Sequence, residues 1–115
     1  MNEKGIEPIG DYEIDPNLAN WLELLQQVFP RVRTFTETLN PASVAANTTS
    51  EQTFTVNGLT TSDIVNVNKP SHTTGLGIGN ARVSNSDELA ITFINTTAGA
   101  IDPAEEDYYI VAIRR

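Results

Sequence analysis

With 115 residues, of which 39% are hydrophobic, the chain is long enough for one modest core and an appendage. It contains no cysteine, which excludes disulfide bonds and thiolate metal sites. Fifteen acidic residues against seven basic ones give a net charge of −8, which would repel a phosphate backbone, so nucleic acid is not an expected partner. No apolar run approaches the roughly 20 residues that cross a bilayer, so no membrane partner is expected.

Residues 1–14 lack any helical or strand period and are interrupted by Gly5, Pro8 and Gly10. Two interpretations stay open. One is a terminus without fixed structure, and the other is an extended arm that docks on a neighbouring subunit through spaced apolar side chains. The candidate interface residues of this arm are Ile6, Ile9, Tyr12 and Ile14.

Residues 15–30 have the pattern of one short amphipathic helix. Asp15 can cap the first turn, Pro16 suits the first helical position, and Pro30 ends the segment. Apolar residues recur at three- and four-residue steps and form one stripe. This stripe packs either on the chain's own β domain or on another copy or protein, and Trp21 suits an interface anchor. The stripe consists of Leu18, Trp21, Leu22, Leu25, Val28 and Phe29.

Residues 31–115 change to short β-rich runs separated by turn residues, which predicts a mainly β, antiparallel β-sandwich or jelly-roll-like domain. The last run, from Tyr108, is the most continuously apolar and is predicted to be a central strand. The seven expected strands are Val32 to Leu39, Ser43 to Ala46, Glu51 to Val56, Asp63 to Asn68, Ile78 to Ser84, Glu88 to Asn95 and Tyr108 to Arg114.

The stretch from Thr53 to Pro70 gives the clearest local pattern. Phe54 and Val56 alternate with threonines, and Asn57-Gly58 marks a tight turn before the next β-branched run. These two strands and their connection are predicted to form the nucleus of an antiparallel sheet domain.

The motifs that resemble functional sites are weak. Gly75, Gly77 and Gly79 lack the further glycine and the helix of a dinucleotide fingerprint, so we interpret them as places where the chain bends or approaches a neighbour. His72 is the single histidine, and no catalytic relay or zinc site can be built on it.

Two further patterns favour ordinary loops. The acidic residues between 102 and 107 could hold calcium, but their spacing matches no EF-hand loop and predicts a solvated acidic loop. Asn47-Thr48-Thr49 and Asn95-Thr96-Thr97 match the glycosylation acceptor pattern, and we interpret them as strand ends and turns. No catalytic residue, cofactor or metal is expected.

About two thirds of the chain, residues 40–115, resembles a small β domain of structural proteins of tailed bacteriophages, particularly cyanophage-like ones. The stretches that carry the resemblance are Asn40-Pro41-Ala42-Ser43-Val44-Ala45-Ala46-Asn47-Thr48, Thr53-Phe54-Thr55-Val56-Asn57-Gly58-Leu59, Val67-Asn68-Lys69-Pro70, Gly75-Leu76-Gly77-Ile78, Asn80-Ala81-Arg82-Val83 and Leu89-Ala90-Ile91-Thr92-Phe93-Ile94-Asn95-Thr96-Thr97.

The resemblance implies a non-enzymatic structural protein located in the virion. The first hypothesis is a homotrimeric capsid decoration, or cement, protein that clamps the major capsid protein with its N-terminal arm. The alternative is a head-fibre, neck or tail-fibre component anchored to another virion structural protein by the arm and helix. A carbohydrate-binding or hydrolytic module is the third hypothesis, and it lacks an evident site.

Overall fold

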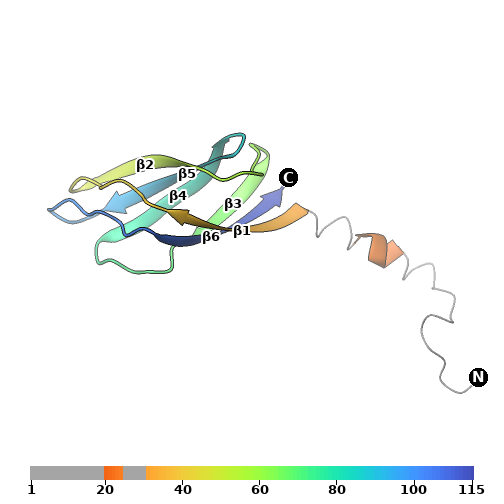
Figure 1. The fold of residues 1–115 in the computed structure, drawn as a ribbon, viewed down its shortest axis with the longest axis horizontal. Helices are drawn as coiled ribbons and strands as arrows, with labels where there is room; N and C mark the ends of the chain where they lie inside the picture. The colour runs from red at the N-terminus through yellow and green to blue at the C-terminus, as the bar shows by residue number, and fades with distance from the viewer. Residues whose placement is uncertain (1–19, 25–30) are drawn as a thin grey trace, which may run out of the picture. The chain divides into compact units, whose positions relative to one another are not determined.

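The computed structural model describes residues 20–24 and 31–115, and the second range folds into six β-strands (Figure 1). Each strand runs antiparallel to its hydrogen-bonded neighbours. The strands are β1 (Val32–Leu39), β2 (Thr48–Thr55), β3 (Asp63–Asn68), β4 (Leu76–Asn85), β5 (Glu88–Asn95) and β6 (Glu106–Arg114).

Three predicted strands, β1, β3 and β5, have the expected bounds, and three others are longer or shifted by a few residues. The predicted strand Ser43 to Ala46 is wrong. Only Val44 pairs there, in an isolated bridge with Ile101 whose two backbone hydrogen bonds are 2.7 and 2.9 Å. Nearby Pro41 has no amide hydrogen, and Asn47 has a positive φ of 51°, so the segment between them cannot extend a regular ladder.

The strands form two three-stranded sheets, ordered β1-β6-β3 and β2-β5-β4. The prediction that the last strand is central is confirmed, because β6 lies between β1 and β3. The two strands of the stretch from Thr53 to Pro70, β2 and β3, belong to different sheets. The turn at Asn57-Gly58 carries the chain from one sheet to the other, which a local turn pattern does not reveal.

The core lies between the two sheets and draws side chains from both, so the predicted antiparallel sandwich is confirmed. Alternate residues of β6, namely Tyr108, Ile110 and Ala112, point inward and are at most 1% exposed. They belong to one cluster with inward residues of β5 such as Leu89 and Phe93. Burial of these side chains from both sheets is the main favourable contribution to folding.

The expected close approach of a neighbour is confirmed at Gly79 in β4 and at Gly75 just before it, but not at Gly77, where a Cβ would meet nothing within 4 Å. A Cβ at Gly79 would lie 2.6 Å from the end of the Ile94 side chain, and β4 has an irregularity in its pairing at this point. Gly75 has a φ of 86°, and a Cβ there would meet Thr97. Both glycines therefore serve packing, and neither opens a helix.

Asn95 is 1% exposed and joins three separate segments of backbone. Its Nδ2 donates to the carbonyls of Val44 and Gly99 at 3.0 and 2.9 Å. Its Oδ1 accepts from the backbone N and Oγ1 of Thr97 at 2.9 and 2.8 Å. This buried amide fixes the loop between β5 and β6, which agrees with our interpretation of the Asn-Thr-Thr pattern as a strand end.

The predicted helix is confirmed only for residues 20–24, where Trp21, Leu22 and Leu24 are exposed. The rest of the predicted helix, with Leu18, Leu25, Val28 and Phe29, lies outside the described residues. The predicted arm, with Ile6, Ile9, Tyr12 and Ile14, also lies outside them.

Replacing Asn95 with alanine is expected to lower the free energy of unfolding by about 2 kcal/mol, because it removes four hydrogen bonds and leaves the Thr97 amide without its partner. The carbonyls of Val44 and Gly99 keep the hydrogen bonds from the Ile101 amide and Thr97 Oγ1. Denaturant unfolding measures this change. The matched control is Asn80→Ala at an exposed position of β4, which is expected to change stability by less than about 0.5 kcal/mol. Equal effects of the two substitutions would show that the Asn95 hydrogen bonds contribute little.

Candidate interaction surface

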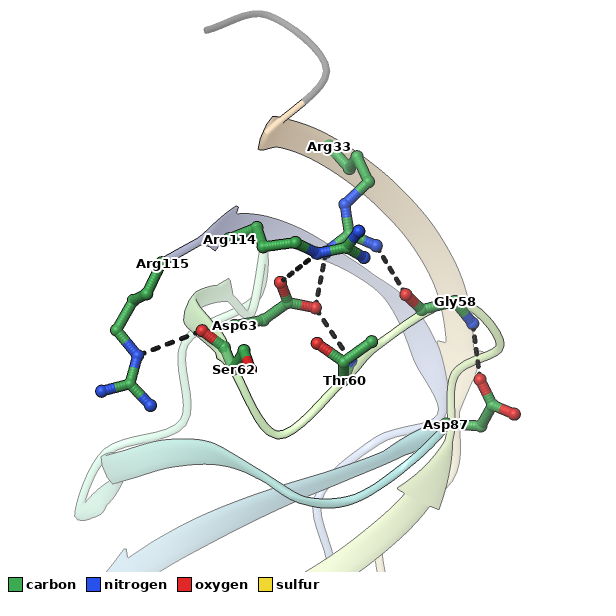
Figure 2. Close-up of polar contacts among 8 residues, drawn as sticks. All are labelled: Arg33, Gly58, Thr60, Ser62, Asp63, Asp87, Arg114 and Arg115. Carbon is green, nitrogen blue, oxygen red and sulfur yellow. Dashed lines mark hydrogen bonds and ion pairs between the residues drawn. The ribbon is translucent and has the colours of Figure 1, made fainter. Parts of the chain in front are cut away.

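A buried carboxylate ties together the three strands of sheet β1-β6-β3 at one end (Figure 2). The Asp63 side chain is 0% exposed and lies 2.5 Å from Nη2 of Arg33 and 3.6 Å from Nε of Arg114. Asp63 begins β3, Arg33 is the second residue of β1, and Arg114 ends β6. One ion cluster therefore joins a residue from each strand, and we call it the Asp63 cluster.

The Asp63 cluster keeps this carboxylate ionised. Burial by itself would raise the pKa of Asp63, but the hydrogen bond from Arg33, the amide of Thr60 and the charges of both arginines together lower it below its usual value. The Thr60 amide donates to Asp63 Oδ2 at 2.9 Å, which also closes the turn before β3. Ionic and hydrogen-bonded contacts thus compensate for the loss of water around the carboxylate.

The turn between β2 and β3 is fastened to the same cluster. Arg33 Nη1 donates to the carbonyl of Gly58 at 2.5 Å, and the Gly58 amide donates to Asp87 Oδ1 at 2.8 Å (Figure 2). Gly58 has a φ of 103°, a conformation that residues with a Cβ rarely adopt. The predicted tight turn at this glycine is confirmed, and it links β1 with the turn between β4 and β5.

The outward side of sheet β1-β6-β3 is uncharged over three consecutive rows of residues. The pairing register places outward residues of β1, β6 and β3 side by side in each row, and we call these nine positions the outer face. Its large apolar members are 38 to 56% exposed. The rows are Val32, Ile113 and Ile64, then Thr34, Val111 and Asn66, then Thr36, Tyr109 and Asn68.

The outward side of the other sheet differs because an ion pair crosses its middle. Nε and Nη2 of Arg82 donate to the two carboxylate oxygens of Glu51 at 2.8 and 2.9 Å. The hydrogen bond from Arg82 lowers the pKa of Glu51. The pair spans the central strand, where Ala90 is 0% exposed. Within residues 31–115, the outer face of β1-β6-β3 is therefore the sheet surface suited to contact with another protein.

His72 lies in a loop and lines a shallow hollow with Lys69, Pro70 and Ser71. The predicted acidic loop, residues 102–107, is a loop only as far as Glu105, because Glu106 and Asp107 begin β6. Glu106 lies 2.8 Å from Lys69 Nζ and accepts a hydrogen bond from Ser71 at 2.7 Å. Over residues 20–24 and 31–115, no group of three or more His, Cys, Asp or Glu side chains is placed to hold a metal ion.

Of the ten interface residues predicted from the sequence, the structure describes only Trp21 and Leu22, which are 57% and 42% exposed. Sequence reasoning missed both the Asp63 cluster and the outer face. The available signal is the two-residue alternation within Tyr-Tyr-Ile-Val-Ala-Ile, residues 108–113. Its second, fourth and sixth residues turn outward. The run is continuously apolar in sequence, but only Tyr108, Ile110 and Ala112 are buried, and Tyr109, Val111 and Ile113 are exposed.

Comparisons with protein families, with curated proteins and with solved structures found no match to this chain. Within the described residues, no helix is long and apolar enough to cross a membrane.

Asp63→Asn is expected to lower the free energy of unfolding by about 2 to 3 kcal/mol at pH 7, because it leaves two arginines without their counter-charge. The half-exposed Arg114 keeps the loss below that of a fully buried pair. The folded-state pKa of Asp63 is lowered, so its contribution is present above its unfolded pKa of about 3.9 and is lost as pH falls through the folded-state pKa.

Denaturant unfolding between pH 7 and pH 2 measures this effect. The difference between wild type and Asp63→Asn is expected to shrink below about pH 4. Asp102→Asn, at an exposed loop position, serves as the matched control and should behave like wild type. A difference that stays constant down to pH 2 would contradict the assigned role of the Asp63 charge.

Proposed function

We propose that this chain is a non-enzymatic structural protein of a virion, and that it acts as a homotrimeric capsid decoration protein. The observation that carries an assembly role is the outer face: five exposed apolar side chains among nine uncharged positions, in a chain of net charge −8. Surfaces of this composition are buried against other proteins. The placement in a virion depends on the resemblance of residues 40–115 to the β domain of phage structural proteins.

The chemistry of the β domain also favours assembly over catalysis. Three of its carboxylates are paired with basic side chains: Asp63 with arginines, Glu51 with Arg82, and Glu106 with Lys69. An enzyme site would bring ionisable groups together around a space for substrate, with pKa values shifted toward their catalytic task. In residues 31–115 the lowered carboxyl pKa values accompany ion pairs and hydrogen bonds that fix strands and loops.

In this proposal the predicted arm, residues 1–14, supplies the specificity for the capsid. Its apolar residues are spaced along the sequence so that separate shallow pockets could receive them, and four acids between them would favour a basic partner surface. The acids are Glu3, Glu7, Asp11 and Glu13.

Deleting residues 1–14 is expected to abolish attachment to particles that have been depleted of this protein, because the apolar anchors are lost. Raised salt is expected to weaken attachment of the full chain, since exposed charges are screened within roughly 8 Å at 0.15 M. Occupancy of the particles by labelled protein, imaged by electron microscopy, measures both effects. Circular dichroism of the shortened protein shows whether the β domain stays folded.

Three results would contradict this proposal, each in a different part. If the shortened protein attaches as tightly as the full chain, the arm does not clamp the capsid. If label is found at the neck or tail and not on the shell, the fibre or neck alternative replaces the decoration role. If no particle component binds the full chain, the virion assignment itself fails.

A further inference from the structure

The outward residues of the central strand β6 form a column. Its charges are complementary to those of a second copy of the column that runs in the opposite direction. In order along β6 the outward residues are an acid, Asp107, and three apolar side chains, Tyr109, Val111 and Ile113. The base Arg115 follows directly after the strand ends at Arg114. The amide and the Nε of Arg115 both donate to the carbonyl of Ser62, at 3.2 and 3.1 Å, which holds Arg115 beside the start of β3. Asp107 lies on the acidic side of the sheet beside Glu106, and Arg115 follows Arg114 at the opposite end.

We propose that two copies of this chain pair through their outer faces about a two-fold axis that crosses β6 at Val111. The axis lies between the two sheets and perpendicular to β6, so that the two central strands run in opposite directions. Asp107 of one copy then lies over Arg115 of the other, Tyr109 lies over Ile113, and Val111 meets its own counterpart. This pairing goes beyond the proposed function, because it does not depend on a virion or on the predicted arm.

The charges select this axis among the possible two-fold axes. An axis parallel to β6 would place Asp107 over Asp107 and Arg115 over Arg115, and like charges at a contact are destabilising. The perpendicular axis gives two opposite-charge contacts and a contact region with no net charge. It therefore lets two copies, each with a net charge of −8, approach through the part of the surface that carries no charge excess.

The flanking strands are compatible with the same axis. The register places Thr34 on β1 and Asn66 on β3 in the row of Val111, so each would face its own counterpart. Hydroxyl and amide side chains both donate and accept hydrogen bonds, so each can pair with a copy of itself. The opposite outer surface offers no such match, because the Glu51–Arg82 ion pair occupies its middle.

The size of the contact indicates a weak association. Three strands about 4.8 Å apart and nine residues along β6 at about 3.3 Å each define a face of roughly 400 Å². This projected area is about half of the roughly 800 Å² that each partner buries in a standard interface. Pairing is therefore expected at high protein concentration, or where copies are held close together on a larger assembly.

The first test uses single cysteines in the full chain, which contains no natural cysteine. Val111→Cys is expected to form covalent dimers with a short bismaleimide reagent, because the axis brings the two thiols together. Tyr109→Cys and Ile113→Cys should cross-link poorly alone and readily when mixed. Thr53→Cys, on the outward side of β2, is the matched exposed control.

The cysteine test overturns the proposal in two ways. If Val111→Cys gives no more dimer than Thr53→Cys, the outer faces do not meet. If Tyr109→Cys alone cross-links as well as the mixture of Tyr109→Cys and Ile113→Cys, the strands run parallel and the proposed axis is wrong.

The second test exchanges the charges. Asp107→Lys and Arg115→Glu are each expected to weaken self-association about tenfold, because each creates two like-charge contacts. An equimolar mixture of the two variants should restore association. In the mixed dimer the new Lys and Glu face each other at one contact, and the native Asp107 and Arg115 face each other at the second. Sedimentation equilibrium of the full chain up to millimolar concentration measures association, and circular dichroism checks folding.

Restoration in the mixture cannot result from misfolding of either variant, so it supports the pairing directly. Failure of the mixture to associate better than the single variants overturns the proposal. A threefold mass that neither substitution changes also overturns it and supports the trimer proposed above. If the two-fold pairing is found and particles do not bind the protein, the virion role is wrong and the pairing still stands. If the pairing is found and trimers bind to particles, the two-fold contact joins neighbouring trimers.

Discussion

The sheet β1-β6-β3 depends on one buried negative charge. Asp63 cannot lose contact with Arg33 and Arg114 without leaving an ionised carboxylate in a site closed to water, so the three strands that carry these residues are held in one register. Because successive side chains alternate between the two sides of a strand, this register also determines which residues lie on the outward side of the sheet. Val32 precedes Arg33, Ile113 precedes Arg114 and Ile64 follows Asp63, so the inward cluster determines the first apolar row of the outer face.

Strand β6 contributes to two different environments at once. Its even-numbered residues from Tyr108 to Ala112 fill the core, and its odd-numbered residues from Tyr109 to Ile113 reach solvent. The core side explains why the strand is central. The solvent side is unusual for a protein with this much negative charge, because the three rows of the outer face contain no acidic residue. A shift of β6 by one residue would turn its core side chains to solvent and its solvent-facing side chains to the core. By fixing the register of β6, the Asp63 cluster therefore keeps each set of side chains on its own side of the sheet.

Much of the strand content follows from the sequence, because two-residue alternation and turn residues are local signals. Three strands have the expected bounds, and the predicted turns at Asn57-Gly58 and Asn85-Ser86-Asp87 are present. The assignment of strands to sheets does not follow, since it depends on contacts between distant residues such as Val32 and Ile113. The candidate surface was missed for the same reason. Arg33, Asp63 and Arg114 look like unrelated surface charges until the topology brings them together, and the outward side of β6 is recognisable only once its partners are known.

The order β1-β6-β3 has a consequence for how the protein is made. The first and last strands are neighbours, and neither β1 nor β3 can complete its backbone hydrogen bonds until β6 has been synthesised. During translation the emerging chain therefore holds β1 and β3 as unpaired strands, with their edges and apolar residues open to other chains. Such nonlocal pairing slows folding, because long loops must close before the contacts that stabilise them form. The threonines of β1 and the asparagines of β3 keep one side of each strand partly polar, which limits the apolar surface that the unpaired strands offer to other chains.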